Sequence, residues 1–155
     1  MKKTNNKGFS LVELIVVIAI MAVLMGVLAP QFLKYVEKSR AQRDASAVGE
    51  VYNATKIALA DEKIAKAVND VLTPAGGGTA GTVTVTISNE GKVSCTSVEA
   101  LLDEITSTTS GNLNFASTTF KSNPNTPITF SIEGSTSTGF KLTPTGMPST
   151  DYTLN

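Results

Sequence analysis

The chain has no histidine, no tryptophan and a single cysteine, Cys95, among its 155 residues. Without histidine it cannot build a Ser-His-Asp triad, a Cys-His pair or a histidine-ligated metal site. One cysteine cannot form an internal disulfide, so we expect Cys95 to be a small core residue. No set of residues typical of an enzyme remains, and we predict a non-enzyme that needs no cofactor and no metal.

Charged residues are also scarce toward the C-terminus, where Glu133 and Asp151 are the only acids past residue 104. No EF-hand pattern is present. A basic run consists of Lys34, Lys38, Arg40 and Arg43. This run could contact phosphates, although a solvated face is the simpler interpretation. Lysine and arginine together equal aspartate and glutamate in number, so the composition predicts no specific nucleic-acid partner.

The N-terminus, by contrast, is dominated by one long apolar run. Every residue between Glu13 and Pro30 is apolar or glycine, and the next charge after Glu13 is Lys34. A helix of about 20 such residues crosses a hydrocarbon core. The preceding segment, 1–8, holds three lysines and no acid, a bias that places the N-terminus in the cytoplasm. A carboxylate inside such a segment is costly, so Glu13 is a candidate functional residue.

Two simpler interpretations of this segment compete with a functional one. A cleaved secretory signal peptide has a shorter apolar stretch and a small-residue cleavage site, and neither feature is found here. A plain membrane anchor explains the lysines and the apolar run, but it leaves Glu13 without a purpose.

Residues 7–14, Lys-Gly-Phe-Ser-Leu-Val-Glu-Leu, resemble the leader and cleavage motif of type IV prepilins and related pseudopilins. The resemblance covers roughly residues 1–59. It implies that a prepilin peptidase cuts between Gly8 and Phe9 on the cytoplasmic side and that the new Phe9 amine is methylated. It also implies that Glu13 approaches the Phe9 amine of a neighbouring subunit during assembly. A buried carboxylate that faces a cation regains part of its desolvation cost by Coulomb attraction.

The helical pattern continues beyond the apolar run to about Ala60. Small and apolar side chains recur at spacings of three and four, and they are Ala41, Ala45, Val48, Tyr52, Thr55 and Leu59. The charged residues of the same stretch, Asp44 and Glu50 among them, are expected largely off that face. Residues 61–72 form a second amphipathic stretch that either extends this helix or breaks off near Asp61.

Gly26 and Pro30 lie four residues apart near the outer end of the apolar half. A proline inside a helix removes one backbone hydrogen bond and clashes with the preceding turn. A modest kink is one interpretation. The other is a segment that loosens when the subunit leaves the bilayer for a filament.

The composition changes at Thr73-Pro74, after which 30 of 83 residues are serine or threonine. Residues 82–88 alternate and predict a strand with Val83, Val85 and Ile87 inward, followed by a returning strand over 92–95. Thr96 and Glu99 predict a capping box for a short helix. Residues 106–127 are expected to be mostly loop, and 128–132 with 139–142 a second hairpin. The Ser/Thr abundance fits exposed loops, with O-glycosylation as the alternative.

Within the same C-terminal part, glycines at 76, 78 and 81 match a dinucleotide-binding spacing, but they follow a helix and precede a strand, which is the wrong context. Tyr152 and Leu154 are possible anchors of an irregular tail. Four short strands could therefore stack on the apolar stripe of the long helix.

These patterns predict an α+β type IV pilin fold with four parts. The parts are a leader (1–8), a membrane or filament-core helix half (9–30), an amphipathic helix half (31–72) and a Ser/Thr-rich β-sheet head (73–155). The resemblance implies a major pilin that assembles into a helical surface filament for adhesion, motility or aggregation. A pseudopilin of a secretion or DNA-uptake system and a monomeric membrane-anchored adhesin are the alternatives.

The resemblance also implies the partners and the location. The partners are further copies of the chain, the prepilin peptidase and methyltransferase, an assembly platform with its ATPase motor, and the cytoplasmic membrane. The precursor would lie in that membrane with its N-terminus inside, and the processed subunit would lie in a pilus outside the cell.

Overall fold

The computed structural model describes residues 8–75, 78–123 and 127–148. The chain divides into two compact units, residues 1–37 and 38–155, and each is treated by itself below. Helix α1 has the bounds Leu11–Ala58, which confirms the long helix predicted from the sequence. Pro30 lies inside this helix, and its only glycines are Gly26 and Gly49. The expected anchors Tyr152 and Leu154, and the glycine at 76, lie outside the described residues.

Within residues 38–155, one stripe of α1 forms part of a single hydrophobic core. Its buried residues repeat at spacings of three and four, and they are Ala41, Asp44, Val48, Val51, Tyr52, Ala54, Thr55 and Ala58. The ring of Tyr52 meets that of Phe130 edge-on, with 5.4 Å between the ring centroids. The predicted apolar stripe is confirmed, because Ala45 packs partly buried against this core and Leu59 is buried in it.

Asp44 corrects the sequence prediction, which placed it off the buried face. It is only 2% exposed, and its carboxylate accepts hydrogen bonds from the backbone N–H groups of Ala116 and Ser117 at 2.7–3.1 Å. Those two residues precede the short helix α4 (Thr118–Lys121). A buried carboxylate is tolerated where charge-assisted hydrogen bonds replace its hydration.

A second helix, α2 (Glu62–Leu72), is separate from α1. Asp61 caps it, since the Asp61 side chain accepts hydrogen bonds from the backbone N–H groups of Lys63 and Ile64. This cap satisfies donors that have no partner inside the helix, so a new helix starts here instead of an extension of α1. Of the two possibilities that the sequence left open, the break near Asp61 is therefore the one observed.

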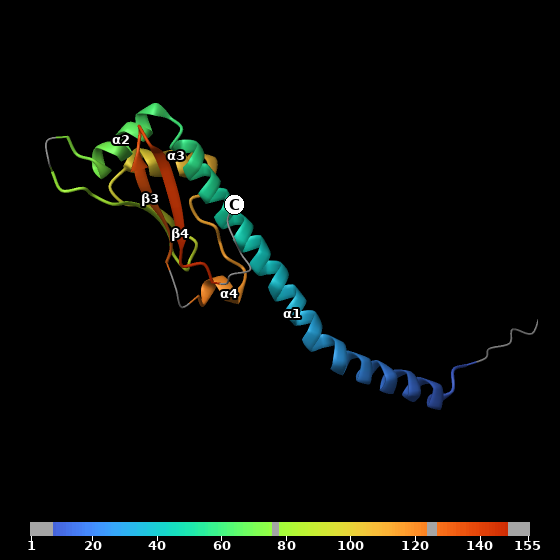
Figure 1. The fold of residues 1–155 in the computed structure, drawn as a ribbon. Coiled ribbons are helices and arrows are strands. Elements are labelled where there is room, and N and C mark those ends of the chain that lie inside the picture. The colour runs from blue at the N-terminus through green and yellow to red at the C-terminus, as the bar shows by residue number, and fades with distance from the viewer. Residues whose placement is uncertain (1–7, 76–77, 124–126, 149–155) are drawn as a thin grey trace, which may run out of the picture. The chain divides into compact units, whose positions relative to one another are not determined.

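The sheet has four antiparallel strands in the order β2-β1-β3-β4. Their bounds are β1 Val83–Ile87, β2 Val93–Cys95, β3 Ile128–Ser135 and β4 Gly139–Thr145. Val83, Val85 and Ile87 are buried, as predicted. In the second hairpin both strands are longer than predicted, and β3 and β4 lie side by side (Figure 1).

Helix α3 (Glu99–Thr108) follows β2, but the predicted Thr96–Glu99 capping box is wrong. The N-cap is Val98, and no side chain caps the helix. Thr96 instead continues the ladder, because its N–H donates to the carbonyl of Thr84, and Ser97 then adopts a φ of 72°. This left-handed residue turns the chain before the helix can begin.

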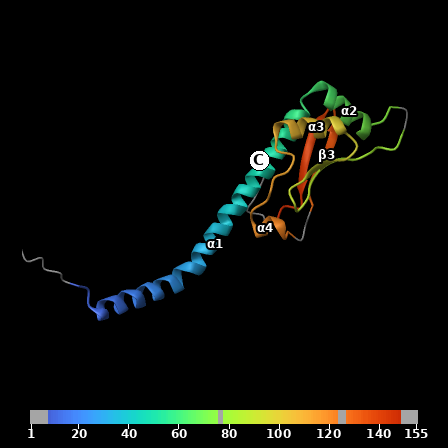
Figure 2. The ribbon, with the colours of Figure 1, turned by 180° about the vertical axis from the view of Figure 1, so that it is seen from behind.

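Between α3 and β3 the structure adds the short α4 to what was expected to be loop. Phe115 and Phe120 are buried there and Leu113 partly so, as the sequence suggested. Both ribbon views place α2 and α3 near one end of the strands and α4 near the other (Figures 1 and 2). The α+β class and the small antiparallel sheet agree with the predicted type IV pilin fold.

Candidate processing and assembly site

Gly8 and Phe9 lie just before α1, and Glu13 lies in its first turn. The Glu13 carboxylate accepts a hydrogen bond from the Ser10 backbone N–H at 2.8 Å. The carbonyl of Ser10 accepts the N–H of Leu14 at 3.2 Å, so Ser10 stands at the N-cap position. Glu13 is then the third residue of the helix, and its side chain reaches back to the capping residue.

This geometry is one half of a capping box, which the sequence analysis overlooked at this position. The pattern Ser-x-x-Glu is present as Ser10 and Glu13, ahead of an apolar run. The carboxylate also lies at the positive end of the helix dipole, where a negative charge is favourable. Glu13 therefore has a structural role within its own chain, in addition to the assembly role that was predicted for it.

The peptide bond between Gly8 and Phe9 lies in an open stretch before the helix. Gly8 is exposed, no heavy atom lies within 4 Å of where a Cβ would stand on it, and Phe9 is 92% exposed. The leader residues 1–7 lie outside the described residues. The nitrogen of Phe9 belongs to this peptide bond, so it becomes an amine only when the bond is cut.

Behind the site, the first unit is an apolar helix with an exposed surface. Large hydrophobic side chains from Leu11 to Tyr35 are 49–73% exposed. Single exposed apolar residues are ordinary, but a continuous surface of this kind marks a protein or membrane interface. By length and composition, α1 is the one described helix that could cross a membrane.

Gly26 and Pro30, the predicted loosening segment, lie on α1 within this unit. No heavy atom lies within 4 Å of a Cβ placed on Gly26, so packing inside the described chain does not demand glycine. The helix includes Pro30 without interruption. Loosening of this segment remains a prediction.

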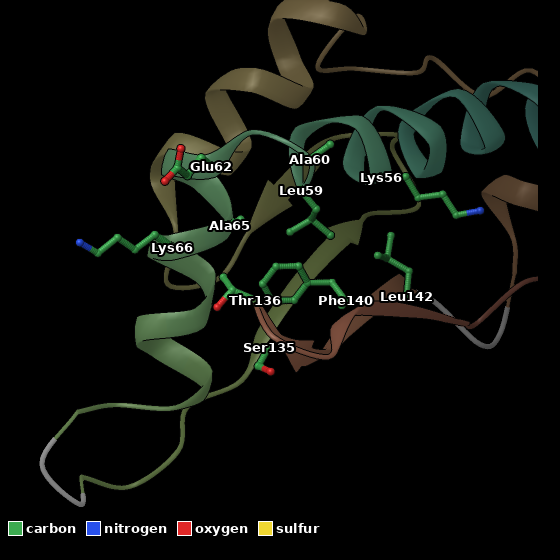
Figure 3. A pocket seen from close by; sticks show the side chains of 11 residues that line it. Lys56, Leu59, Ala60, Glu62, Ala65, Lys66, Ser135, Thr136, Phe140 and Leu142 are labelled. Carbon is green, nitrogen blue, oxygen red and sulfur yellow. The ribbon is translucent and has the colours of Figure 1, made fainter.

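The second unit has a surface pocket of about 590 Å³ between the α1–α2 junction and the β3–β4 hairpin. Figure 3 shows the ring of Phe140 with Leu59 and Leu142 in it, while the side chains of Lys56 and Lys66 point outward. Glu62 is its one acidic lining residue. Such a lining offers apolar contact and no pair of groups for acid–base chemistry.

Metal and thiol chemistry have little support in the described ranges. Residues 8–75, 78–123 and 127–148 contain no group of three Cys, Asp or Glu placed to hold a metal ion. Burial raises the pKa of the Cys95 thiol, and a backbone hydrogen bond at Val98 opposes this in part. The thiol is therefore protonated at neutral pH and a poor nucleophile.

Comparison with known proteins agrees with the geometry of the N-terminus. Residues 3–29 match the prokaryotic N-terminal methylation motif. The chain is similar to a type IV major fimbrial protein FimA of Dichelobacter nodosus, with 33% identity over 48% of this chain and 52% of the relative. A second FimA of that organism is 36% identical over 39% of this chain and 38% of the relative.

A further relative is a prepilin peptidase-dependent protein A of Clostridium perfringens. It is 31% identical over 70 residues, which are 45% of this chain and 50% of the relative. The chain thus spans about half the length, or less, of the curated relatives that it matches. No solved structure matches the chain.

Proposed function

The methylation motif and the fimbrial relatives support a type IV pilin precursor, and we propose that the mature chain is a structural subunit of a type IV pilus. A prepilin peptidase would cut between Gly8 and Phe9, and a methyltransferase would modify the Phe9 amine. The precursor would lie in the cytoplasmic membrane with residues 1–8 inside. The processed subunit would then be extracted into a surface filament by an assembly platform and its ATPase.

The observation that carries the proposal is the exposed apolar surface of residues 11–35. Its side chains leave roughly half or more of their surface uncovered in the isolated chain. Such a surface is stable in a bilayer or against other apolar helices, and not in water. A precursor that lies in a membrane and a polymer whose helices pack together supply these two hosts in turn.

Glu13 has a role in both the membrane-bound precursor and the filament. Its carboxylate caps α1 at Ser10 in the described chain. In a filament core the same carboxylate would lose hydration, and a neighbouring Phe9 amine would offset that loss. Cleavage at Gly8 creates this amine, so processing and assembly are coupled through one charge pair. A pair of this kind also fixes the axial position of one subunit against the next.

Subunits related by a rotation and a translation make contacts that do not close into a ring, and they produce a helical filament. The β-sheet units would cover the outside of this filament. Whether the filament is a long pilus for adhesion or motility, or a short pseudopilus for secretion or DNA uptake, depends on its length and its partner machinery.

Mass spectrometry of protein sheared from the cell surface tests the proposal directly. We expect an N-terminal peptide that begins at methylated Phe9, recovered from filaments visible by electron microscopy. Protein confined to membranes with residues 1–8 still attached would overturn the proposal and favour a simple anchor. Processed protein without long surface filaments would favour the pseudopilin.

A further inference from the structure

The sheet face that points away from the helices carries hydroxyl groups in a regular pattern. Strands β1, β3 and β4 each present two serine or threonine residues that are two positions apart, and Ser94 of β2 and Thr96 just after it form a fourth such pair. Residues so spaced lie on the same face. Across the sheet they align in two rows by the strand register. The first row is Ser94, Thr86, Thr129 and Thr145, and the second is Thr96, Thr84, Ser131 and Thr143. We call these eight residues the hydroxyl face.

The hydroxyl face is open to its surroundings. None of the eight residues is buried, and Ser94, Thr96 and Thr145 are exposed. The alternate residues of the same strands, such as Val85 and Phe130, are fully buried in the core. The helices of the second unit therefore cover one side of the sheet, and the described residues leave the other side uncovered.

Neither row contains a charged or aromatic side chain. The nearest charges on this side border the two rows. Lys92 lies two positions before Ser94 beside the first row, and Glu133 and Lys141, cross-strand partners of opposite sign, lie beside the second. Most soluble surfaces intersperse charges of both signs, which limits association between copies. Threonine suits strands and forms cross-strand pairs, such as Thr84 with Thr96 and Thr129 with Thr145. Strand stability, however, does not require all eight positions to be uncharged.

We propose that the hydroxyl face binds the same face of a second copy of the chain, carried by a neighbouring filament, so that filaments associate side by side. This inference rests on the proposed filament function. The face is the surface of a sheet, whereas small-molecule sites are concave and lined by apolar groups with a few convergent polar ones. A second sheet face is the partner that it fits, since sheets stack face to face.

The chemistry of the hydroxyl face makes it complementary to itself. A hydroxyl group both donates and accepts, so two identical hydroxyl rows can satisfy each other in either orientation. Two identical faces that carried charges of one sign would instead repel, because every charge would then meet like charges on the other copy. The methyl groups of threonine supply apolar contact between the hydroxyls. No other component is needed to form such a contact.

The size of the face predicts when association occurs. Four strands about 4.8 Å apart and two rows of side chains give roughly 300 Å² per face, or about 600 Å² for a pair. Stable complexes bury about 1,200–2,000 Å² in total, so a single pair of subunits should not dimerise. A filament repeats the face along its length, and many weak contacts made together give a strong one. Association is therefore expected between filaments and not between monomers.

The test uses purified filaments in buffer, with Thr129→Lys and Thr129→Glu as variants at the centre of the face. Thr129 lies between Thr86 and Thr145 in the first row. Matched controls place the same charges at Ser107, an exposed residue of α3, which packs on the other side of the sheet. Low-speed sedimentation measures the bundled fraction, and electron microscopy distinguishes bundles from single filaments.

We expect wild-type filaments and both Ser107 controls to pellet as bundles, with little dependence on salt because no charge pair is involved. Each Thr129 variant should form single filaments whose pelleted fraction falls about tenfold, since avidity multiplies every weakened contact. A further sample mixes Thr129→Lys filaments with Thr129→Glu filaments. That mixture should bundle again, now in a salt-sensitive way, because the two faces attract each other.

Wild-type filaments that stay single, variants that bundle like the wild type, or a mixture that does not bundle would each overturn the inference. If a Thr129 variant assembles poorly, the same pair of charges at Thr143, on the edge strand β4, repeats the test. A wild-type chain that forms no filament at all would overturn the proposed function, and this inference with it. That outcome is visible before any variant is made.

Discussion

The carboxylate of Glu13 accepts a hydrogen bond at the start of α1, and in the proposed function it also pairs with a neighbouring Phe9 amine. Two substitutions can separate the observed role from the proposed one. Glu13→Gln keeps an acceptor oxygen for the Ser10 N–H, because glutamine also serves in a capping box. It removes the charge that would pair with the Phe9 amine. If the charge pair governs assembly, Glu13→Gln should be processed and then fail to enter filaments, as Glu13→Ala should. Measurement of processed and sheared protein by immunoblot checks this. Normal assembly of Glu13→Gln would show that capping is the role that matters.

Asp44 is expected to be the most sensitive charged residue of the second unit. Asp44→Ala removes the acceptor for the Ala116 and Ser117 N–H groups and leaves buried donors unsatisfied. We expect a loss of roughly 2–4 kcal/mol in the free energy of unfolding. Urea denaturation in detergent measures it. Arg43→Ala is the control, because Arg43 is 68% exposed and 3.8 Å from Asp44. It should change stability by less than about 1 kcal/mol, and an equal loss would mean that the ion pair matters more than the backbone bonds.

Cys95 gives a prediction that depends on pH. Burial raises the pKa of its thiol, so the folded chain keeps the proton at pH values where an unfolded chain releases it. The protonated thiol therefore adds stability below the unfolded-state pKa. This contribution is lost as the pH rises through the folded-state pKa. Alkylation by iodoacetamide at pH 8 should be much slower for the folded protein than for the same protein in urea. Equal rates would contradict the raised pKa.

At the scale of elements, the β3–β4 hairpin depends on one glycine. Gly134 has a φ of 114°, and a Cβ there would collide with the carbonyl oxygen of Gly139 on the paired strand. Gly134→Ala should cost about 3 kcal/mol or more, because strain and the collision add together. Gly139→Ala is the matched control. Gly139 also has a positive φ, 82°, but nothing lies within 4 Å of its Cβ, so about 1–2 kcal/mol is expected. The urea denaturation midpoints of the two variants show whether Gly134→Ala destabilises the protein more than backbone strain alone does at Gly139→Ala.

The elements that the sequence predicted well are those in which one short spacing of apolar residues repeats along the whole element. The stripe from Ala41 to Leu59 and the alternation over 83–87 each repeat a single pattern, and their apolar residues are buried as expected, Ala45 only partly. Local capping signals were less reliable, because two segments far apart in the chain can compete for the same group. Thr96 bonds to the strand residue Thr84 and so cannot cap α3.

Long-range contacts explain the remaining differences. Asp44 was expected largely off the apolar stripe, but the backbone groups that satisfy its carboxylate lie more than 70 residues later. The hydroxyl face could not be predicted from serine and threonine content either. It depends on the strand order and register, which place residues from four separate segments in two rows. By contrast, Gly8, Phe9 and Glu13 are close in sequence, so the motif alone was sufficient to predict them as a processing and assembly site, and their roles stay a prediction.

At the scale of the whole molecule, the two units should differ in what they need from their surroundings. Every buried hydrophobic residue of the described core lies at or after Ala41, while the large apolar residues from Leu11 to Tyr35 are exposed. Residues 38–155 should therefore form a soluble monomer that unfolds cooperatively in urea. The full chain should require detergent, a membrane or a filament. Analytical ultracentrifugation of both, with and without detergent, measures this difference.

The matched control for that experiment changes only the apolar surface. Replacement of Val16, Ile20 and Val23 by glutamine in the full chain should reduce its need for detergent. It should leave the urea midpoint of the second unit unchanged, since none of these residues contributes to the buried core. If residues 38–155 aggregated or lacked a cooperative transition, the second unit would depend on the apolar helix to fold. In the proposed filament function, extraction from the membrane and folding of the second unit would then be coupled. We predict instead that the second unit is folded before the subunit enters a filament, because its buried core contains no residue of the apolar helix before Ala41.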